Sequence, residues 1–362
     1  MSIDPKTLSK FCILPWVSVQ VNQDGAILPC CRTDEKYLYG QLDDSTTVRE
    51  AWNSENTKKM RKAMLAGEDL PQCRDCLSCE SKGAPSIRRD FNRRFAADFD
   101  RVARTKADGW FSYDEGLRHL GVRFSNVCNL RCRTCSPKNS TSWSADAKAA
   151  GIPTPPTTKL SPRPTFEEFA ADLEPMIPTL KSVYFAGGEP LLADGHIRFL
   201  EMLLAAGRKD VALNYNTNFT ELGLGSKSIF ELWHEFDEIH VSASLDGVGR
   251  VAELVRKGCD WDSIVKNFYR LGFLPNVKFS IHCTISVLNC FHLPEAIDEW
   301  LRRKMIHTPG MLELNFVRDP EWYDIIEKQL CWTKGGRHKV TQKKLAEPKL
   351  DIKTRVGQSP DV

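Results

Sequence analysis

Three cysteines, Cys128, Cys132 and Cys135, lie close together in the stretch NVCNLRCRTCSPK, residues 126–138. Cysteines clustered in this way favour metal ligation over a disulfide framework in a chain without a secretory signal. A closed metal site normally takes four ligands, so these three thiols predict a metal centre with one open coordination position. An open position is typical of catalytic metal sites, where it receives water or a substrate group.

A second group of cysteines lies near the N-terminus. The stretch WVSVQVNQDGAILPCC alternates apolar and polar residues on each side of Asp24 and Gly25, which predicts a β-hairpin. The hairpin would bring the segment of Cys12 back toward Cys30. The stretch CRDCLSC then supplies paired cysteines that can chelate one ion or cluster together. The six members of this group are Cys12, Cys30, Cys31, Cys73, Cys76 and Cys79.

Four of these six cysteines are enough to close one metal site. Either Cys31 or Cys79 could replace a neighbour in the set we assign. Paired cysteines suit a structural zinc ion as well as an iron–sulfur cluster, so both metals remain open from these residues alone. The assigned ligands are Cys12, Cys30, Cys73 and Cys76.

The chain from about residue 117 onward repeats one unit, in which an apolar, β-branched run is followed by a turn and a segment with helical periodicity. Six such units predict a parallel sheet covered by helices, either an open doubly wound sheet or a barrel or partial barrel. The predicted strands are 117–125, 181–187, 211–217, 238–245, 277–285 and 311–318. The predicted helices are 166–177, 196–207, 228–236, 261–271, 293–304 and 321–330.

Polar or thiol-bearing stretches follow five of the predicted strands. The cysteine loop follows the first strand, and GGEP (187–190), NTN (216–218), SLDG (244–247) and TISVLN (284–289) follow the next four. In parallel α/β folds the loops after the strands meet at one edge of the sheet, where ligands bind. We therefore expect one functional site at this edge.

The cysteine spacing C-x3-C-x2-C after the first strand, with GGEP one unit later, makes residues 117–320 resemble the radical S-adenosylmethionine (SAM) enzymes. The resemblance implies a 4Fe-4S cluster on Cys128, Cys132 and Cys135, whose fourth iron takes the amino and carboxylate groups of SAM. One electron from the reduced cluster then cleaves SAM to methionine and a 5′-deoxyadenosyl radical, which abstracts hydrogen from a substrate. The resemblance also implies a reducing partner, such as flavodoxin or ferredoxin.

The resemblance further implies a SAM-binding role for residues in three of the strand-ending stretches. Glu189 would accept a hydrogen bond from the SAM ammonium, and Gly187 and Gly188 would let the backbone approach its methionyl part. The polar residues of NTN and SLDG would bind the ribose hydroxyls or the carboxylate, although both stretches are also ordinary turn sequences. No residue is singled out as catalytic. The implied SAM-binding residues are Gly187, Gly188, Glu189, Asn218, Ser244 and Asp246.

The N-terminal cysteines resemble the twitch and SPASM domains, which hold auxiliary 4Fe-4S clusters in radical SAM enzymes. The resemblance rests on G-x4-C from Gly25 to Cys30, an earlier cysteine and a later C-x2-C. Beside a radical SAM core, an iron–sulfur cluster is favoured over zinc. A cluster with four cysteine ligands would either stabilise the domain or accept an electron from the substrate. Transfer of this electron would permit a net oxidation of the substrate. The usual order is reversed here, since such a domain ordinarily follows the barrel.

Between the two parts, residues 86–111 carry Phe91, Phe95, Phe99 and Val102 at helical spacing amid arginines. Basic residues interleaved with aromatic ones can bind single-stranded nucleic acid, but more often they form an amphipathic helix with a solvated basic side. We predict a connecting helix packed on the barrel. The predicted domains are a twitch/SPASM-like domain at 1–85, a connecting helix at 86–116, a partial (β/α)6 TIM-like barrel at 117–332 and a flexible basic tail at 333–362.

Composition adds limits on location and partners. The formal net charge is +3, so there is no strong attraction to nucleic acid or an anionic membrane. The basic tail is the exception, with eight Lys or Arg against three Asp or Glu. The N-terminus lacks a secretory signal and no apolar run approaches about 18 residues, so we expect a cytoplasmic protein without a membrane partner.

These observations together predict a radical SAM enzyme that modifies a peptide, a protein side chain or a small polar substrate, by a net oxidation assisted by the auxiliary cluster. A nucleotide or nucleic acid substrate is an alternative, motivated only by the basic residues of 86–111 and of the tail. A non-catalytic zinc or iron–sulfur protein is a further alternative. None of the residues named above specifically recognises an amino acid, a sugar or a base. The sequence therefore does not identify the substrate.

Overall fold

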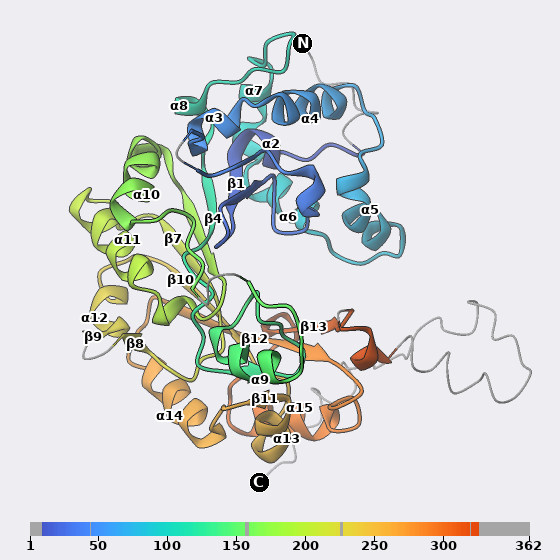
Figure 1. Cartoon of the computed structure of the whole chain (residues 1–362), viewed down its shortest axis with the longest axis vertical. Coiled ribbons are helices and arrows are strands. Elements are labelled where there is room, and N and C mark those ends of the chain that lie inside the picture. Colours follow the sequence, from blue (N-terminus) through green and yellow to red (C-terminus); the bar gives the residue numbers. More distant parts are fainter. Residues whose placement is uncertain (1–8, 44, 156–158, 225–226, 319, 326–362) are drawn as a thin grey trace, which may run out of the picture.

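A computed structural model of the chain describes residues 9–43, 45–155, 159–224, 227–318 and 320–325. One sheet runs through the described residues, and Figure 1 shows it curving through the molecule. Its nine strands are β1 Ser18–Val21, β2 Ala26–Leu28, β3 Gly40–Gln41, β4 His119–Arg123, β6 Ser182–Ala186, β7 Ala212–Thr217, β10 Ile239–Ser244, β12 Val277–Ile285 and β13 Leu312–Phe316. They lie side by side in the order β13-β12-β10-β7-β6-β4-β1-β2-β3.

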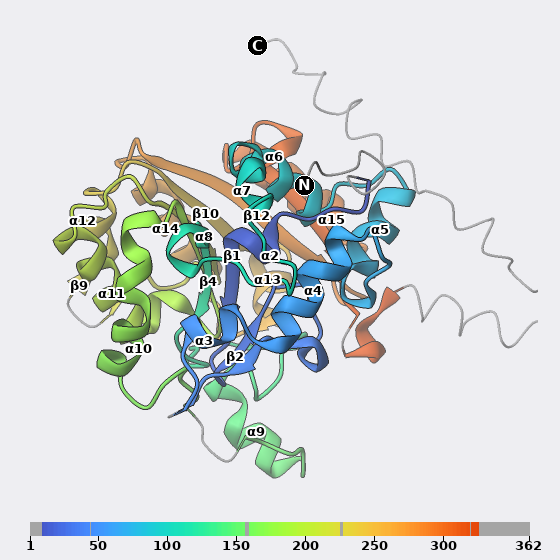
Figure 2. The ribbon, with the colours of Figure 1, turned by 90° about the horizontal axis from the view of Figure 1, so that it is seen from above.

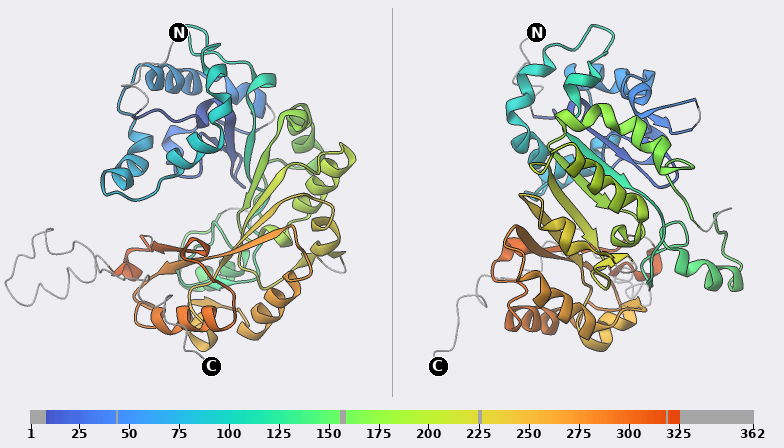
Figure 3. Two further views of the ribbon diagram at one scale, coloured as in Figure 1. Left: turned by 180° about the vertical axis from the view of Figure 1, so that it is seen from behind. Right: turned by 90° about the vertical axis from the view of Figure 1, so that its left-hand side faces the viewer.

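The six strands from β4 to β13 form the predicted barrel part. They pair in parallel and follow one another in chain order. A doubly wound sheet would reverse its strand order at a switch point, so this sheet is the partial (β/α)6 barrel, and all six predicted strands are confirmed. The crossover helices lie along its outer side (Figures 1 and 3). They are α10 Phe166–Leu173, α11 Asp194–Ala205, α12 Ile229–Trp233, α14 Trp261–Leu271 and α15 Leu293–Arg302.

Shorter elements lie in the connections between these strands. The segment 136–164, which has no clear core face in the sequence, contains a helix, α9. Two small ladders of two residues per strand pair β11 with β5 and β8 with β9. The predicted helix at 321–330 and the basic tail lie outside the described residues, except for a turn of 3-10 helix at Glu321–Tyr323. The short elements are β5 Arg131–Cys132, α9 Ser144–Ala149, β8 Gly223–Leu224, β9 Lys227–Ser228, α13 Gly249–Val255 and β11 Arg256–Lys257.

The two faces of the barrel sheet differ in chemistry, as β10 illustrates. Ile239, Val241 and Ala243 point to the helix side and are fully buried, whereas His240 and Ser242 point to the other side and stay partly exposed. Apolar residues at alternate positions of a strand pack against the covering helices, because successive side chains point to opposite faces. The face opposite the helices is therefore left polar, and we call it the inner face.

The predicted N-terminal hairpin extends this same sheet. β1 and β2 pair antiparallel around a turn in which Gly25 has φ of +82°, a conformation that favours glycine. A Cβ at Gly25 would also lie 2.9 Å from the Leu42 carbonyl oxygen. β1 pairs in parallel with β4, with Val19 opposite Leu120. The cysteine-rich N-terminal part is therefore continuous with the barrel through backbone hydrogen bonds.

Helices surround the N-terminal strands (Figure 2). The connection 86–111 is not the single helix predicted, because it breaks into α6, a 3-10 turn at Ala96–Asp98 and α7. Asp98 at the break is buried and accepts hydrogen bonds from Arg101, Arg118 and Lys181, which hold the turn in place. These helices are α2 Leu14–Val17, α3 Val48–Trp52, α4 Glu55–Leu65, α5 Arg74–Ser81, α6 Ile87–Arg94, α7 Phe99–Val102 and α8 Tyr113–Gly116. None of the described helices is long and apolar enough to cross a membrane.

The aromatic stripe of the connection packs inward, as an amphipathic segment should. Phe95 and Val102 are buried, and Phe91 contacts His119 of β4 with ring centroids 4.8 Å apart. Arg88 of α6 is also buried and binds Glu80 of α5 through two guanidinium nitrogens. Burial would raise the pKa of Glu80, but hydrogen bonds from Arg88 and Ser86 hold it below its ordinary value. This ion pair joins the connection to the helix that carries Cys76 and Cys79.

Breaking the ion pair between Arg88 and Glu80 is expected to destabilise the protein. The two side chains are only 5% and 6% exposed, so Arg88→Met leaves the buried carboxylate to the exposed Arg89, 3.3 Å away, at a cost of up to about 3–5 kcal/mol. Urea unfolding of the variant measures the loss. Arg93→Met is the matched control, because the Arg93 side chain is 79% exposed and its removal should cost less than about 1 kcal/mol. Equal effects of the two substitutions would contradict the assigned role.

Candidate functional site

The loop after β4 carries the three closely spaced cysteines, and Cys132 lies in the short strand β5. A segment rich in serine and threonine, residues 139–143, folds against this loop and hydrogen-bonds its carbonyl groups. The loop is thus held from outside, with the thiols left free of disulfide bonds. The hydrogen bonds are Ser140 Oγ to Leu130 O at 2.7 Å, Ser142 Oγ to Cys128 O at 2.6 Å and Trp143 Nε1 to Cys132 O at 3.1 Å.

N–H groups point at the sulfurs of this loop. The Leu130 amide lies 3.4 Å from Cys128 Sγ, and Arg256 Nη1 lies 3.8 Å from Cys132 Sγ. Burial raises the pKa of Cys132 to about 12, so its thiol is neutral at neutral pH unless a metal replaces the proton. Thiolates are the ligands of iron–sulfur clusters, and N–H donors to sulfur tune such clusters. The donor set and its surroundings therefore fit a cluster with three protein ligands.

The GGEP loop after β6 lies directly against the cysteine loop. Gly188 N donates to Ser125 O at 3.0 Å, and Glu189 N donates to Val127 O at 2.7 Å. A Cβ at Gly188 would come 2.3 Å from Val127 O, closer than any side chain can approach. Gly187 has φ of +125°, in the region that favours glycine. The glycines are therefore needed for the contact between the two loops, a reason that the motif alone does not reveal.

Glu189 is a buried carboxylate that forms no ion pair with any of the residues that the structure describes. Its oxygens accept hydrogen bonds from Thr217 Oγ1 at 2.8 Å and from the amides of Asn218 at 2.6 Å and Leu191 at 3.1 Å. Burial raises its pKa to about 7, and these hydrogen bonds oppose the rise. A carboxylate held in this way close to Cys128 suits a cationic ligand. The ammonium group of SAM is such a ligand.

The other SAM-binding residues predicted from the sequence lie in different surroundings. Asn218 is close to the cluster loop, with Nδ2 3.7 Å from Cys128 Sγ and 2.9 Å from Asn129 Oδ1. Ser244 ends β10 and points to the inner face. Asp246 is buried, and its carboxylate contacts the Thr284 amide at 2.7 Å and Arg256 Nε at 2.8 Å. The carboxylate of Asp246 thus already has two partners, and its direct contact with SAM stays a prediction.

Arg256 is a candidate site residue that the sequence analysis does not identify. β11 pairs antiparallel with β5, which sets Arg256 opposite Cys132 and within reach of Asp246. The side chain is only 13% exposed. Its contact to Cys132 spans 124 residues of chain, so no local pattern marks this arginine. Together with Glu189 it places one buried cation and one buried anion beside the three cysteines.

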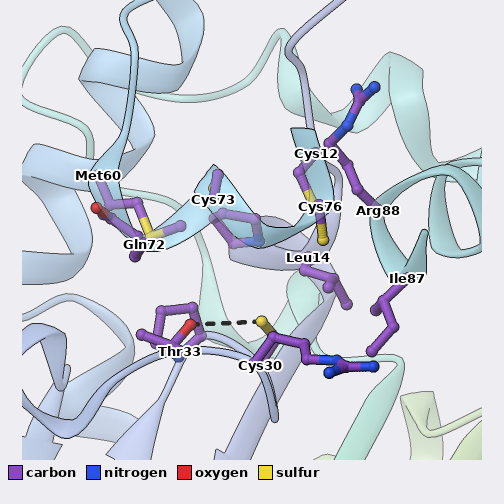
Figure 4. Close-up of a pocket in the computed structure, with 13 residues that line it drawn as sticks. Cys12, Leu14, Cys30, Thr33, Met60, Gln72, Cys73, Cys76, Ile87 and Arg88 are labelled. Atoms are coloured by element: carbon purple, nitrogen blue, oxygen red, sulfur yellow. Dashed lines mark hydrogen bonds between the residues drawn. The ribbon is translucent and has the colours of Figure 1, made fainter. Parts of the chain in front are cut away.

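The four assigned N-terminal cysteines line one pocket (Figure 4). They come from the start of the chain, from the segment after β2 and from the first turns around α5. Burial raises the pKa of Cys12 well above its ordinary value, and the other three cysteines add to the rise. Cys31 and Cys79 are exposed and do not line the pocket. No three His, Cys, Asp or Glu side chains in the described ranges are placed to share a single metal ion. The lining cysteines are Cys12, Cys30, Cys73 and Cys76.

Comparison with known protein families agrees with this arrangement. Residues 122–282 match the radical SAM superfamily, and residues 12–80 match the SPASM iron–sulfur cluster-binding domain. The chain therefore contains a radical SAM domain over residues 122–282, preceded by a SPASM domain over residues 12–80. The first domain implies a 4Fe-4S cluster and SAM, and the second implies auxiliary iron–sulfur clusters. No curated protein matches the chain.

Solved structures that match parts of the chain include anSMEcpe with bound AdoMet, at 18% identity and a TM-score of 0.43. That match covers 56% of this chain and 53% of the other, so the chain spans about half the length of that relative. Streptococcus suis SuiB bound to precursor peptide SuiA matches at 15% identity with a TM-score of 0.44, covering 77% of this chain and 60% of the other.

The number of iron atoms tests the assignment of the cysteines. Anaerobically reconstituted protein should contain about eight irons per chain if it holds two 4Fe-4S clusters. Cys12→Ala should lower this number to about four, because Cys12 is the most buried ligand of the pocket. Cys79→Ala and Cys31→Ala are the matched controls and should leave about eight irons. Iron and sulfide analysis with zinc determination measures the outcome, and a protein that holds zinc without iron would contradict the cluster assignment.

Proposed function

We propose that this protein is an enzyme that cleaves SAM reductively and abstracts hydrogen from a peptide or small polar substrate bound on the inner face of the sheet. The observation that supports this most is the buried carboxylate of Glu189, held against the loop of Cys128, Cys132 and Cys135. When bound, the cluster and SAM supply a 5′-deoxyadenosyl radical as the hydrogen-abstracting species. The chain itself supplies the binding and orientation of both.

Glu189 and Asn218 would hold the amino-acid part of SAM. The backbone amides of Leu191 and Asn218 fix the carboxylate of Glu189 in one orientation, so that an ammonium group gains a preorganised acceptor. The Asn218 amide group lies between this carboxylate and Cys128. A cation bound here would neutralise the charge of Glu189 in a site that excludes water.

Arg256 and Asp246 would fix the opposite side of the cluster loop. Their ion pair connects β5 and β11 with the ends of β10 and β12. A carboxylate group such as that of SAM would find its cation in Arg256. Ser244, half-exposed on the inner face, would bind a hydroxyl group. These roles follow from position and charge.

The pocket of Cys12, Cys30, Cys73 and Cys76 would hold the auxiliary cluster. Four thiolates occupy all four irons, so this cluster would relay an electron or stabilise the domain rather than bind substrate. Relay would leave the substrate oxidised by two electrons in total, one lost as a hydrogen atom and one passed to the cluster. A nucleic acid substrate has less support, because the aromatic stripe of 86–111 packs against the core and Arg88 is paired.

Loss of Cys132 should abolish SAM cleavage. Cys132→Ala removes one of three ligands, so formation of 5′-deoxyadenosine under strong reductant should fall to background. Cys290→Ala is the matched control, because Cys290 belongs to neither cysteine cluster and its thiol donates to a backbone carbonyl, Val287 O, at 3.9 Å. Chromatographic measurement of 5′-deoxyadenosine gives the rates. Turnover that survives in Cys132→Ala would show that the radical cluster lies elsewhere.

SAM affinity should depend on pH through Glu189. The pKa of this carboxylate is raised to about 7, so below that pH it is increasingly protonated and loses its attraction for an ammonium group. We expect the dissociation constant of SAM to rise by up to about tenfold for each pH unit between pH 7 and pH 5.5. Glu189→Gln should bind SAM weakly with little dependence on pH in this window. Equilibrium binding to anaerobic protein measures both, and an unchanged pH dependence in the variant would assign the titration to another group.

A further inference from the structure

The inner face of the sheet presents rows of polar side chains. Parallel register places Asn216, Ser242 and Ser280 side by side on three neighbouring strands. The two serines are hydrogen-bonded at 3.0 Å. Two residues further along β12, His282 lies opposite Glu313 of β13, with Nε2 and Oε2 3.1 Å apart. A polar surface of this kind binds its ligand by hydrogen bonds and charge.

Two arginines on the side of the N-terminal domain lack a counter-charge. Arg123 ends β4, and its guanidinium donates only to the amide oxygen of Asn22, at 3.1 Å. Arg32 follows the cysteine pair at 30 and 31 and is exposed. Neither arginine forms an ion pair with any residue in the described parts of the chain. A half-buried guanidinium without a carboxylate partner is costly unless a ligand supplies the negative charge.

Position connects these two arginines to the two cysteine sites. Arg123 borders the GGEP loop, since a Cβ at Gly187 would lie 3.3 Å from Arg123 Cβ. Arg32 lines the pocket of the four N-terminal cysteines. Tyr184 shares a sheet face with Arg123, because the parallel register sets Gly121 opposite Tyr184 and Arg123 opposite Ala186. Asn22, whose amide oxygen accepts from Arg123, belongs to the hairpin that leads to Arg32. The arginines therefore flank the region between the radical site and the auxiliary site.

We propose that Arg123 and Arg32 bind a carboxylate of the substrate, an amino acid or peptide group, and hold it between the two cysteine sites. This inference rests on the proposed function, and it names the chemical class that the function leaves open. A guanidinium can bind both oxygens of a carboxylate at once, which fixes position as well as charge. A substrate anchored in this way lies between the source of the radical and the acceptor of the electron.

The charges on the inner face favour an acidic peptide over a nucleic acid. Glu313 also lies on the inner face, beside His282, so this face carries a carboxylate. Sites for single-stranded nucleic acid combine a continuous basic groove with several aromatic platforms. A phosphate backbone would meet the carboxylate of Glu313, whereas a peptide can place one carboxylate at the arginines and an amide or ammonium donor near Glu313.

Binding of small peptides to the reconstituted full-length protein, with SAM present, tests this proposal. The probes are acetyl-Gly-Glu-Gly-amide and its glutamine counterpart acetyl-Gly-Gln-Gly-amide, measured by calorimetry at low ionic strength. We expect the glutamate peptide to bind at least about tenfold more tightly, a difference of one charged contact. Arg123→Gln should remove this preference, and Arg32→Gln should reduce it. Arg104→Gln is the control for net charge, because Arg104 pairs with Glu115 on the surface, and it should keep the preference.

Three results would overturn the proposal. Equal binding of the two peptides would show that no carboxylate is recognised. A preference that survives in Arg123→Gln, with SAM affinity lost instead, would assign this arginine to the cofactor. Tighter binding of a pentathymidylate than of the glutamate peptide, lost in Arg123→Gln, would identify a nucleic acid site. A protein that shows the peptide preference but forms no 5′-deoxyadenosine would contradict the proposed function while leaving the carboxylate site intact.

Discussion

The contact between the loop after β4 and the loop after β6 is the constraint on which the site depends. Two backbone hydrogen bonds, from Gly188 to Ser125 and from Glu189 to Val127, hold these loops in van der Waals contact. Only glycine allows the approach, because a Cβ at Gly188 would overlap the Val127 carbonyl. The same contact carries the Glu189 carboxylate to the cysteine loop, so the anion and the thiols are positioned by one backbone interaction.

The second constraint is that both cysteine sites belong to a single sheet. The SPASM domain precedes the barrel in the chain and joins it through β1 at β4, the first barrel strand, while β13 forms the opposite edge. Backbone pairing over four residues fixes the orientation of β1 relative to the cysteine loop that follows β4. Direct strand pairing therefore sets the N-terminal domain against the barrel, with Ser18 of β1 opposite His119 at the start of β4, whereas the cysteine loop follows the end of β4.

Much of the fold follows from local patterns in the sequence. The barrel strands are recognisable because their helix-facing residues form apolar runs, and the hairpin because Asp24 and Gly25 suit its turn. The four cysteines that line the N-terminal pocket are the four assigned from spacing. The break in the 86–111 helix could not be predicted, since it depends on Asp98 meeting Arg118 and Lys181 from other elements. Arg256 could not be predicted either, because it comes close to Cys132 through strand pairing between segments far apart in the chain.

The distribution of buried charge explains why so polar a site is stable in a folded protein. Asp246 and Arg256 neutralise each other next to Cys132, which lowers the cost of burying both. Glu189 is held by hydrogen bonds within the described residues, and burial raises its pKa to about 7. The Arg123 guanidinium donates a hydrogen bond to the side-chain amide oxygen of Asn22. It forms no ion pair with a carboxylate of the described residues. Among the described residues, the GGEP loop thus carries a carboxylate without an ion pair, Glu189, and borders a guanidinium without one, Arg123, which is the arrangement expected where charged ligands complete the site.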